Sequence, residues 1–131
     1  MATFWTIIED IRKNAYTERD KGTRFERLIR NYLKTSKKYE ILLKEVWLWS
    51  EFPYRREFGG TDTGIDLVAL TNDGQYWAIQ CKCYAENTTI DKAAVDSFLS
   101  TSSRRFKDDN MEIQGFSSRI WFATNNKWGK N

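Results

Sequence analysis

The chain has 131 residues, of which 40% are hydrophobic and 15% aromatic, enough apolar material for one well-packed domain. Its formal net charge of +3 permits a polyanionic partner without requiring one. The sequence contains no histidine, which excludes serine–histidine triads and histidine-ligated zinc sites.

Two cysteines, Cys81 and Cys83, lie too close together in one predicted strand to bond to each other, and they are too few for a structural zinc site. Free thiols suit a reducing cytoplasm. The sequence shows no signal-peptide pattern and no apolar run near 18 residues. We therefore expect a cytoplasmic protein without a membrane segment.

Two amphipathic helices are predicted near the N-terminus. Apolar residues at helical spacing predict the first over residues 3–14, and a polar connection follows over 16–22. Thr23 opens the second helix, and Thr23 and Glu26 have the spacing of a capping box, in which Glu26 would bond back to the cap backbone. We accordingly divide the single domain, 1–131, into a helical extension over 1–22 and a main body over 23–131.

The next predicted element is a strand over 45–50, which Pro53 ends. A loop over 51–62 follows and carries Arg55 and Arg56. Two apolar runs then flank a Thr-Asn-Asp-Gly turn, which predicts a β-hairpin with the three-residue loop 72–74 and Gly74 in the left-handed conformation.

This loop pairs Thr71 with Gln75, so Asp66 faces Gln80, and Lys82 lies two residues further along the same sheet face. Their Cβ atoms are expected to be roughly 5–7 Å apart. A bulge would shift the register and could send Asp66 to the opposite face.

Both faces of the hairpin are otherwise apolar, as in a sheet covered on both sides. One face holds Val68, Leu70, Tyr76 and Ala78, and the other holds Ile65, Leu67, Ala69, Trp77, Ile79 and Cys81. Charged side chains in such strands need a partner such as a metal ion or a phosphate, although a solvated face is the simpler alternative.

After a polar loop, Thr88 or Thr89 caps a predicted helix that reaches about residue 106, with Ile90, Ala94, Val95, Phe98 and Leu99 as its buried stripe. A surface connection over 108–114 leads to a strand over 119–124. A strand, a helix and a strand in this order predict a parallel crossover. The chain is thus α/β, with the order α-α-β-β-β-α-β.

Gly64-Ile65-Asp66 followed by Gln80-Cys81-Lys82 resembles the core of the PD-(D/E)XK nuclease superfamily, and in particular its Mrr-like branch, in which glutamine replaces the second acidic residue. The resemblance covers residues 23–130. It implies a restriction-endonuclease-like α-β-β-β-α-β core, a mixed sheet with helices on both faces, and here an extra N-terminal helix.

The segment 120–129 resembles N-terminal nuclease domains fused to helicases in single-chain restriction-modification enzymes, including the type ISP group. This implies an endonuclease that needs Mg²⁺, with Mn²⁺ as a substitute, and that cuts double-stranded DNA with little sequence specificity. Helicase or translocase and methyltransferase domains would be fused to it. The alternatives are a catalytically silent DNA-binding or docking domain and a junction or flap resolvase.

In the resembling family, Asp66, the Gln80 side-chain oxygen and the Cys81 backbone carbonyl would hold the metal, while Lys82 would orient the attacking water. Glu26 would be a further ligand, so its role as a cap or a ligand stays open. Because glutamine lowers the charge at the metal, Glu26 and Asp62 are the acids that could restore it. We expect DNA contacts from Arg55, Arg56, Tyr84, Arg104 and Arg105, with Arg55 and Arg56 as the better candidates for phosphate contact. A solvated face is the simpler alternative for the basic residues of the second helix, Arg24, Arg27, Arg30 and Lys34, and for those after the third, Arg104, Arg105 and Lys107.

Overall fold

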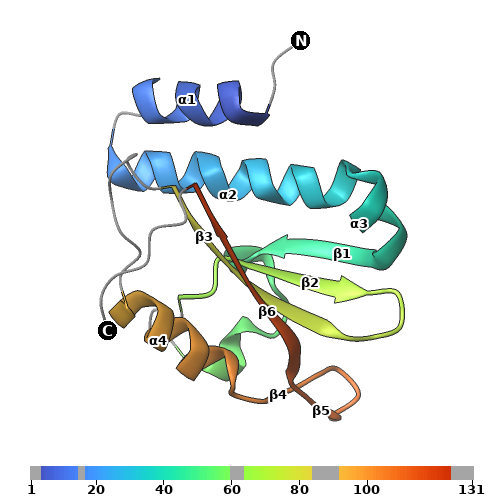
Figure 1. Cartoon of the computed structure of the whole chain (residues 1–131). Helices are drawn as coiled ribbons and strands as arrows, with labels where there is room; N and C mark the ends of the chain where they lie inside the picture. Colours follow the sequence, from blue (N-terminus) through green and yellow to red (C-terminus); the bar gives the residue numbers. More distant parts are fainter. Residues whose placement is uncertain (1–3, 15–16, 60–63, 84–91, 125–131) are drawn as a thin grey trace.

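A four-stranded mixed sheet forms the centre of the structure, a computed structural model that describes residues 4–14, 17–59, 64–83 and 92–124 (Figure 1). Its strand order is β1-β2-β3-β6. The strands are β1 (Leu43–Leu48), β2 (Leu67–Thr71), β3 (Tyr76–Lys82) and β6 (Phe116–Ala123). β2 pairs antiparallel with both β1 and β3, whereas β6 runs parallel to β3, which confirms the predicted parallel crossover.

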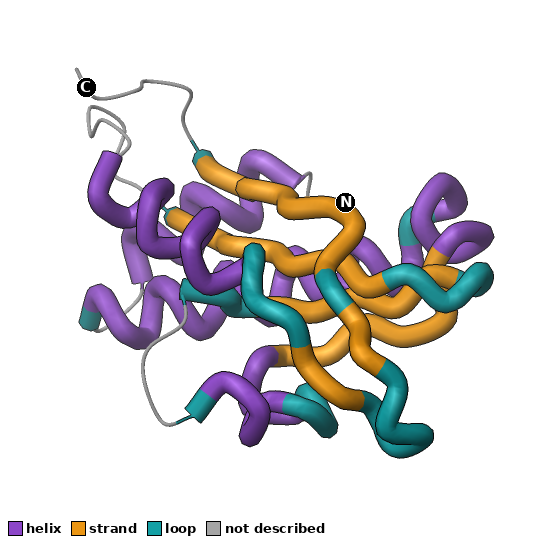
Figure 2. The backbone as a smooth tube through the Cα atoms, turned by 90° about the horizontal axis from the view of Figure 1, so that it is seen from below, coloured by secondary structure: helices purple, strands orange, loops and turns teal. Residues whose placement is uncertain are grey.

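Helices cover both faces of this sheet, as predicted. The helices α1 (Phe4–Asn14) and α2 (Glu18–Thr35) lie on one side, and α4 (Lys92–Ser102) lies on the other, as Figures 1 and 2 show. A short helix that was not predicted, α3 (Lys37–Leu42), connects α2 to β1. Within the described residues, no helix is both long enough and apolar enough to cross a membrane.

Two apolar cores fill the space between the sheet and its helices, because successive side chains of a strand point to opposite faces. Leu67, Ala69, Ile79 and Cys81 pack with α1 and α2 in the first core. The second core includes Val68, Tyr76 and Ala78 from the strands, together with Phe98 from α4. The sheet is therefore covered on both sides, as the hairpin pattern predicted.

Ile65 is an exception, because it packs in the second core and not with Leu67. It precedes β2, and its neighbour Gly64 has φ +70°, so the strand alternation does not extend to it. The predicted face of Ile65 was wrong.

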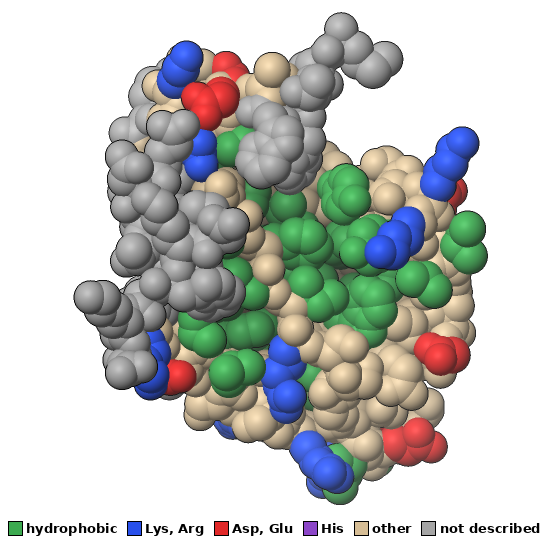
Figure 3. Space-filling view, in the orientation of Figure 1, with side chains coloured by type: hydrophobic (Ala, Val, Ile, Leu, Met, Phe, Trp, Pro, Cys, Tyr) green, Lys and Arg blue, Asp and Glu red, His purple; other side chains and the backbone are tan. Residues whose placement is uncertain are grey.

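On the first-core side, Trp77, Ile120 and Phe122 are only partly buried. Figure 3 shows hydrophobic side chains gathered over the middle of the face on which β6 lies.

The predicted hairpin register is confirmed. Leu67 pairs with Ile79 and Val68 with Ala78, while the Thr71 amide donates to the Gln75 carbonyl at 2.8 Å. Gly74 closes the three-residue loop at φ +86°. The pairing is regular from Leu67 to Leu70. Just before it, the Asp66 amide donates to the Ile79 carbonyl, as in a β-bulge, so Asp66 lies opposite Ile79 and the predicted register does not extend to Asp66.

The N-terminus of α2 differs from the prediction. Thr17 is the N-cap, and its hydroxyl accepts from the Asp20 amide at 2.9 Å. Thr23 therefore lies inside the helix, and the capping box of Thr23 and Glu26 was wrong. The expected boundary between residues 22 and 23 also falls within α2. Since Ile8 of α1 is only 1% exposed in the first core, α1 packs as part of the domain.

The remaining differences lie at element ends. β1 begins and ends two residues before its predicted bounds, and the segment that follows contains two 3₁₀ helices, η1 (Trp49–Glu51) and η2 (Arg55–Phe58). The helix α4 ends at Ser102, and Leu99 is 46% exposed, contrary to the predicted stripe. Phe106 belongs to β4 (Phe106–Lys107), which pairs with β5 (Ile113–Gln114) in the predicted connection. The proposed cap at Thr88 or Thr89 and Ile90 lie outside the described residues.

Candidate active site

A cleft of about 330 Å³ lies between the first half of α2 and the ends of the β2–β3 hairpin. Its lining residues are Lys21, Gly22, Glu26, Asp66, Cys81, Lys82 and Cys83. Four residues that the sequence predicted as site residues, Glu26, Asp66, Cys81 and Lys82, thus meet in one place. Lys21, Gly22 and Cys83 were not predicted.

Asp66 is held firmly at the start of β2. Its amide donates to the Ile79 carbonyl and its own carbonyl accepts from the Trp49 amide, both at 2.8 Å. Its side-chain Oδ2 accepts from the Cys81 amide at 2.7 Å. Contacts with β3 and with the first residue of η1 therefore fix the carboxylate at the cleft.

Glu26 enters the cleft from α2, one helical turn after Gly22. Burial, together with the negative charge of Asp66, raises the pKa of Glu26 to about 7, against the opposing effect of Lys82 and Arg27. Because Thr17 caps the helix, the capping role for Glu26 is excluded. Glu26 is instead a carboxylate that titrates near neutral pH beside Asp66.

Lys82 ends β3 and supplies a positive charge close enough to lower the pKa of Glu26. The neighbouring Cys81 thiol is buried in the first core, and burial, then the charges of Asp66 and Glu26, raise its pKa well above the ordinary value. A thiol in this state is neutral and a poor nucleophile. The Cys81 carbonyl as a metal ligand stays a prediction.

Gln80 lies beside Asp66 but is not among the residues that line the cleft. Its side chain is 3% exposed, and the end of its amide meets Asp66 Oδ2 and the Gly64 carbonyl. The structure therefore brings Gln80 and Asp66 together as predicted. Whether the Gln80 oxygen binds a metal stays a prediction.

The four described arginines predicted to contact DNA are all exposed and lie on two adjoining segments, and we call them the arginine patch: Arg55, Arg56, Arg104 and Arg105. Its two segments are joined, because the Lys107 amide donates to Glu57 Oε1 at 3.0 Å. The guanidinium group of Arg104 also lies 5.3 Å from the centre of the Phe58 ring. Tyr84 and Asp62 lie outside the described residues.

The arginine patch is distant from the cleft. The Phe106 ring beside it contacts Tyr76 and Phe116, the first residues of β3 and β6, with ring centres 5.1 and 5.4 Å apart. Lys82 stands at the other end of β3. Six residue steps of a strand span roughly 20 Å, so the patch and the cleft lie near opposite ends of the sheet.

Two of the basic residues on α2 have structural partners. Arg24 pairs with Asp20 at 3.1 Å, and Arg30 pairs with Glu51 at 2.9 Å, which ties α2 to η1. These ion pairs fit the interpretation of a structural and solvated helix face.

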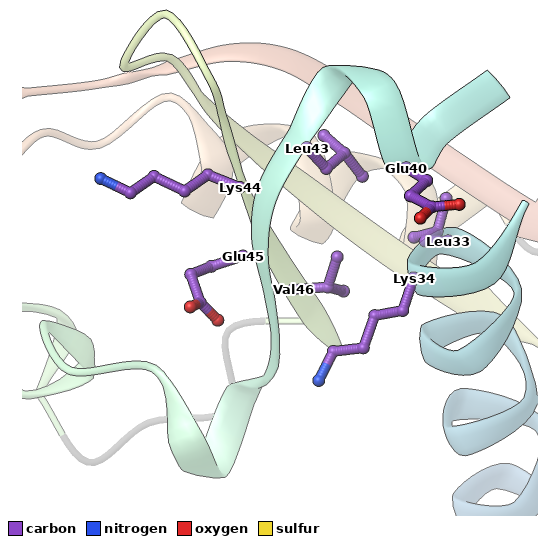
Figure 4. A pocket seen from close by; sticks show the side chains of 7 residues that line it. All are labelled: Leu33, Lys34, Glu40, Leu43, Lys44, Glu45 and Val46. Carbon is purple, nitrogen blue, oxygen red and sulfur yellow. The ribbon is translucent and has the colours of Figure 1, made fainter. Parts of the chain in front are cut away.

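A second cavity, of about 270 Å³, lies between α2, α3 and the edge strand β1 (Figure 4). Leu33, Leu43 and Val46 form its apolar part, and Lys34, Glu40, Lys44 and Glu45 bring charges to it. It contains none of the predicted site residues. Charged side chains on an edge strand protect it from pairing with other strands, so a structural explanation suffices.

The mixed sheet, with Asp66 and Lys82 at the end of its central hairpin and Glu26 facing them from α2, defines a protein of the restriction-endonuclease-like class. Residues 34–131 match the model of a family described as restriction endonuclease, Mrr_cat_2. The chain belongs to this family, which confirms the Mrr-like resemblance. The match covers Asp66, Gln80 and Lys82 but begins after Glu26.

The chain is also similar to a solved structure, an ATP-dependent Type ISP restriction-modification enzyme, LlaBIII, bound to DNA. The similarity has a TM-score of 0.68 and 26% sequence identity, and it covers 100% of this chain. The chain spans only 7% of the length of that enzyme. No curated protein matches the sequence.

Proposed function

We propose that this domain is a metal-dependent endonuclease that hydrolyses phosphodiester bonds in double-stranded DNA, as the cleavage module of a larger restriction enzyme. The observation that carries the proposal is the convergence of Glu26, Asp66 and Lys82 in one cleft. Membership of a restriction endonuclease family supports it. So does the similarity to a DNA-bound Type ISP enzyme, from which we infer fusion to translocase and methyltransferase domains.

The cleft has a suitable donor set for Mg²⁺, with Mn²⁺ as a substitute. Mg²⁺ prefers oxygen ligands and is commonly held by one or two carboxylates together with substrate phosphates. Asp66 and Glu26 would supply the carboxylates, and the Cys81 carbonyl would add a neutral oxygen. Within the described residues, no group of three or more His, Cys, Asp or Glu side chains is placed to hold a metal. DNA phosphates would therefore complete the ligand set.

When bound, the ion would neutralise phosphate charge and make an attacking water more acidic. The side chains have separate tasks around it. Asp66 supplies a carboxylate in a fixed orientation, while Glu26, with a pKa of about 7, gains its full charge only above neutral pH. The ammonium group of Lys82 orients the water and stabilises the negative charge that develops on the attacked phosphate. Lys21 adds a second cation to the lining of the cleft.

The test is cleavage of supercoiled plasmid by the chain, and by the enzyme that contains it, with and without Mg²⁺ or Mn²⁺. Asp66→Ala should reduce cleavage by more than the roughly 10–100-fold loss that outer-shell changes around a metal cause, because it removes a ligand. The variant should keep a cooperative thermal transition, since no core volume is lost.

Asp96→Ala is the matched control, because Asp96 is exposed on α4 and pairs with Lys92, one turn away on the same helix, at 2.7 Å. It should cleave at the parental rate. Equal cleavage by the Asp66 and Asp96 variants would refute the proposed site. A wild-type enzyme that binds DNA without cutting it in either metal would instead favour the silent docking domain, and preferential cutting of branched DNA would favour a resolvase.

A further inference from the structure

We propose that Gln80 is a positioning residue that holds Asp66 in one orientation from behind the cleft, and that it does not itself bind the metal. This inference rests on the proposed function, since it concerns how that site is held. It also gives a physical reason for an amide at a position where the resembling superfamily usually has an acid.

The location of Gln80 is the first argument. Along β3, Tyr76 and Ala78 point into the second core, and Gln80 follows them at the same two-residue spacing. Its side chain is 3% exposed and does not line the cleft. Glu26, by contrast, comes from α2 on the first-core side. The carboxylate of Asp66 thus lies between the cleft and the buried amide of Gln80.

The hydrogen bonds are the second argument. The end of the Gln80 amide meets two acceptors, the Gly64 carbonyl and Asp66 Oδ2, the latter at 2.8 Å. Only a donor satisfies both, and the amide nitrogen carries two N–H groups, so it is the nitrogen that faces them. Asp66 Oδ2 also accepts from the Cys81 amide at 2.7 Å. Two donors on one oxygen fix the rotation of the carboxylate, and with it the direction of the second oxygen.

The backbone of Gly64 is the third argument. Gly64 has φ +70°, and a Cβ on it would lie 3.6 Å from the Phe98 backbone. A side chain in this conformation would be strained, so the turn before β2 is specific to glycine. Gln80 bonds to the carbonyl of this turn and to Asp66 two residues later. Gln80 therefore fixes both Gly64 and Asp66, the two ends of the short segment that places the Asp66 carboxylate at the cleft.

The two possible roles of Gln80 predict opposite effects of Gln80→Glu on metal binding. If Gln80 were a metal ligand, a carboxylate would strengthen binding of a hard cation. In the buried position that the structure gives, an unprotonated carboxylate would set acceptors against Gly64 O and Asp66 Oδ2 and would turn Asp66 away. The sign of the change in metal affinity therefore distinguishes the two roles.

The first experiment is calorimetric titration of Mn²⁺ in the presence of uncleavable DNA. Gln80→Glu should weaken Mn²⁺ binding by about 10–100-fold, the usual effect of disturbing a residue that supports a ligand. Gln75→Glu is the control, because it makes the same chemical change at an exposed position at the opposite end of the hairpin. It should bind as the wild type does. Tighter binding by Gln80→Glu than by the wild type would overturn the proposal.

The second experiment needs no substitution at Gln80 and no metal. Proton exchange of the Gln80 side-chain amide, followed by NMR, should be slow in the wild type and fast in Asp66→Ala, where one acceptor is lost. Equal exchange in both proteins would overturn the proposal. Because this measurement is made without metal, it stays decisive if the wild type binds no Mn²⁺, a result that would count against the proposed function alone.

Discussion

At the scale of single residues, the stability of the fold and the proposed function require opposite protonation states of Glu26. A metal ligand must be ionised, yet burial and the neighbouring Asp66 favour the protonated form and raise the pKa of Glu26 to about 7. A bound cation would relieve this conflict. The metal affinity of the cleft should therefore fall as the pH drops below about 7, when Glu26 takes up its proton.

Glu26→Gln should separate the two effects. Because the folded-state pKa of about 7 exceeds the ordinary 4.5, the folded protein binds this proton more tightly than the unfolded chain does. The stability that protonated Glu26 supplies is present below the unfolded pKa and is lost as the pH rises through the folded pKa. Glutamine cannot ionise, so the metal-free variant should melt at a higher temperature than the wild type at about pH 8, with weaker Mg²⁺ binding.

Melting temperatures of both proteins between about pH 5 and pH 8, with and without Mg²⁺, provide the measurement. Mg²⁺ should raise the melting temperature of the wild type most at the alkaline end. Glu45→Gln serves as the control, since Glu45 is an exposed residue of β1 away from the cleft. Parallel pH profiles for the wild type and Glu26→Gln would contradict a raised pKa at Glu26.

At the scale of elements, the hairpin was predictable because its turn alone sets its register. Gly74 and the three-residue loop determine which residues pair between Leu67 and Leu70, although Asp66, just before β2, bonds to Ile79 and leaves this register. The resemblance then supplied the chemistry. The direction of the Gln80 side chain follows from strand alternation, since Gln80 lies on the face of Tyr76 and Ala78. The irregular backbone at Asp66 could not be predicted, because it depends on the turn at Gly64, whose φ is +70°.

The start of α2 was predicted six residues too late, because Gly22 suggested a connection between helices. In the structure, Thr17 is the N-cap of α2. Lys21 and Gly22 were missed as cleft residues for the same reason. The sequence did contain a signal: Gly22 precedes Glu26 by four residues, which places both on one helix face. Likewise, β4 and β5 are two residues long each, too short for strand periodicity to reveal.

Gly22 gives a test of α2 as the wall of the cleft. It lies inside a helix, where glycine costs roughly 1 kcal/mol relative to alanine. An added Cβ would meet nothing within 4 Å. Gly22→Ala should thus stabilise the domain by up to about 1 kcal/mol and keep cleavage.

Gly22→Leu is the matched variant, because leucine is also a good helix former but extends into the cleft. It should keep most of the added stability and lower metal-dependent cleavage by at least roughly 10-fold, since small misplacements at a reacting centre have large effects. Denaturant unfolding and plasmid cleavage measure the two quantities. Full activity of the leucine variant would show that substrate does not approach α2.

At the scale of the whole molecule, the cleft and the arginine patch lie near opposite ends of β3 and β6. Their separation along the sheet is roughly 20 Å. The strand of a DNA duplex advances about 3.4 Å per nucleotide, so one duplex that touches both would do so about six base pairs apart. The patch would then anchor the duplex by its phosphates while the cleft cuts it, a division between positioning and chemistry.

Removing the exposed charges of the patch should therefore weaken DNA binding and leave the metal site intact. We expect Arg55→Ala, Arg56→Ala and Arg105→Ala, combined, to lower DNA affinity on every sequence alike and to reduce the slope of log K against log salt by about one per lost phosphate contact. Arg104 is retained in this variant, because its guanidinium group packs on the Phe58 ring.

The matched control replaces three lysines elsewhere, Lys34 and Lys44 at the second cavity and Lys37 on α3, and so removes the same charge. Fluorescence anisotropy over a range of salt concentrations gives both slopes, and Mn²⁺ titration checks the metal site. A smaller slope for the arginine variant alone would place the duplex across the patch. Equal slopes for the two triple variants would mean that only overall charge matters, and that DNA reaches the cleft along another face.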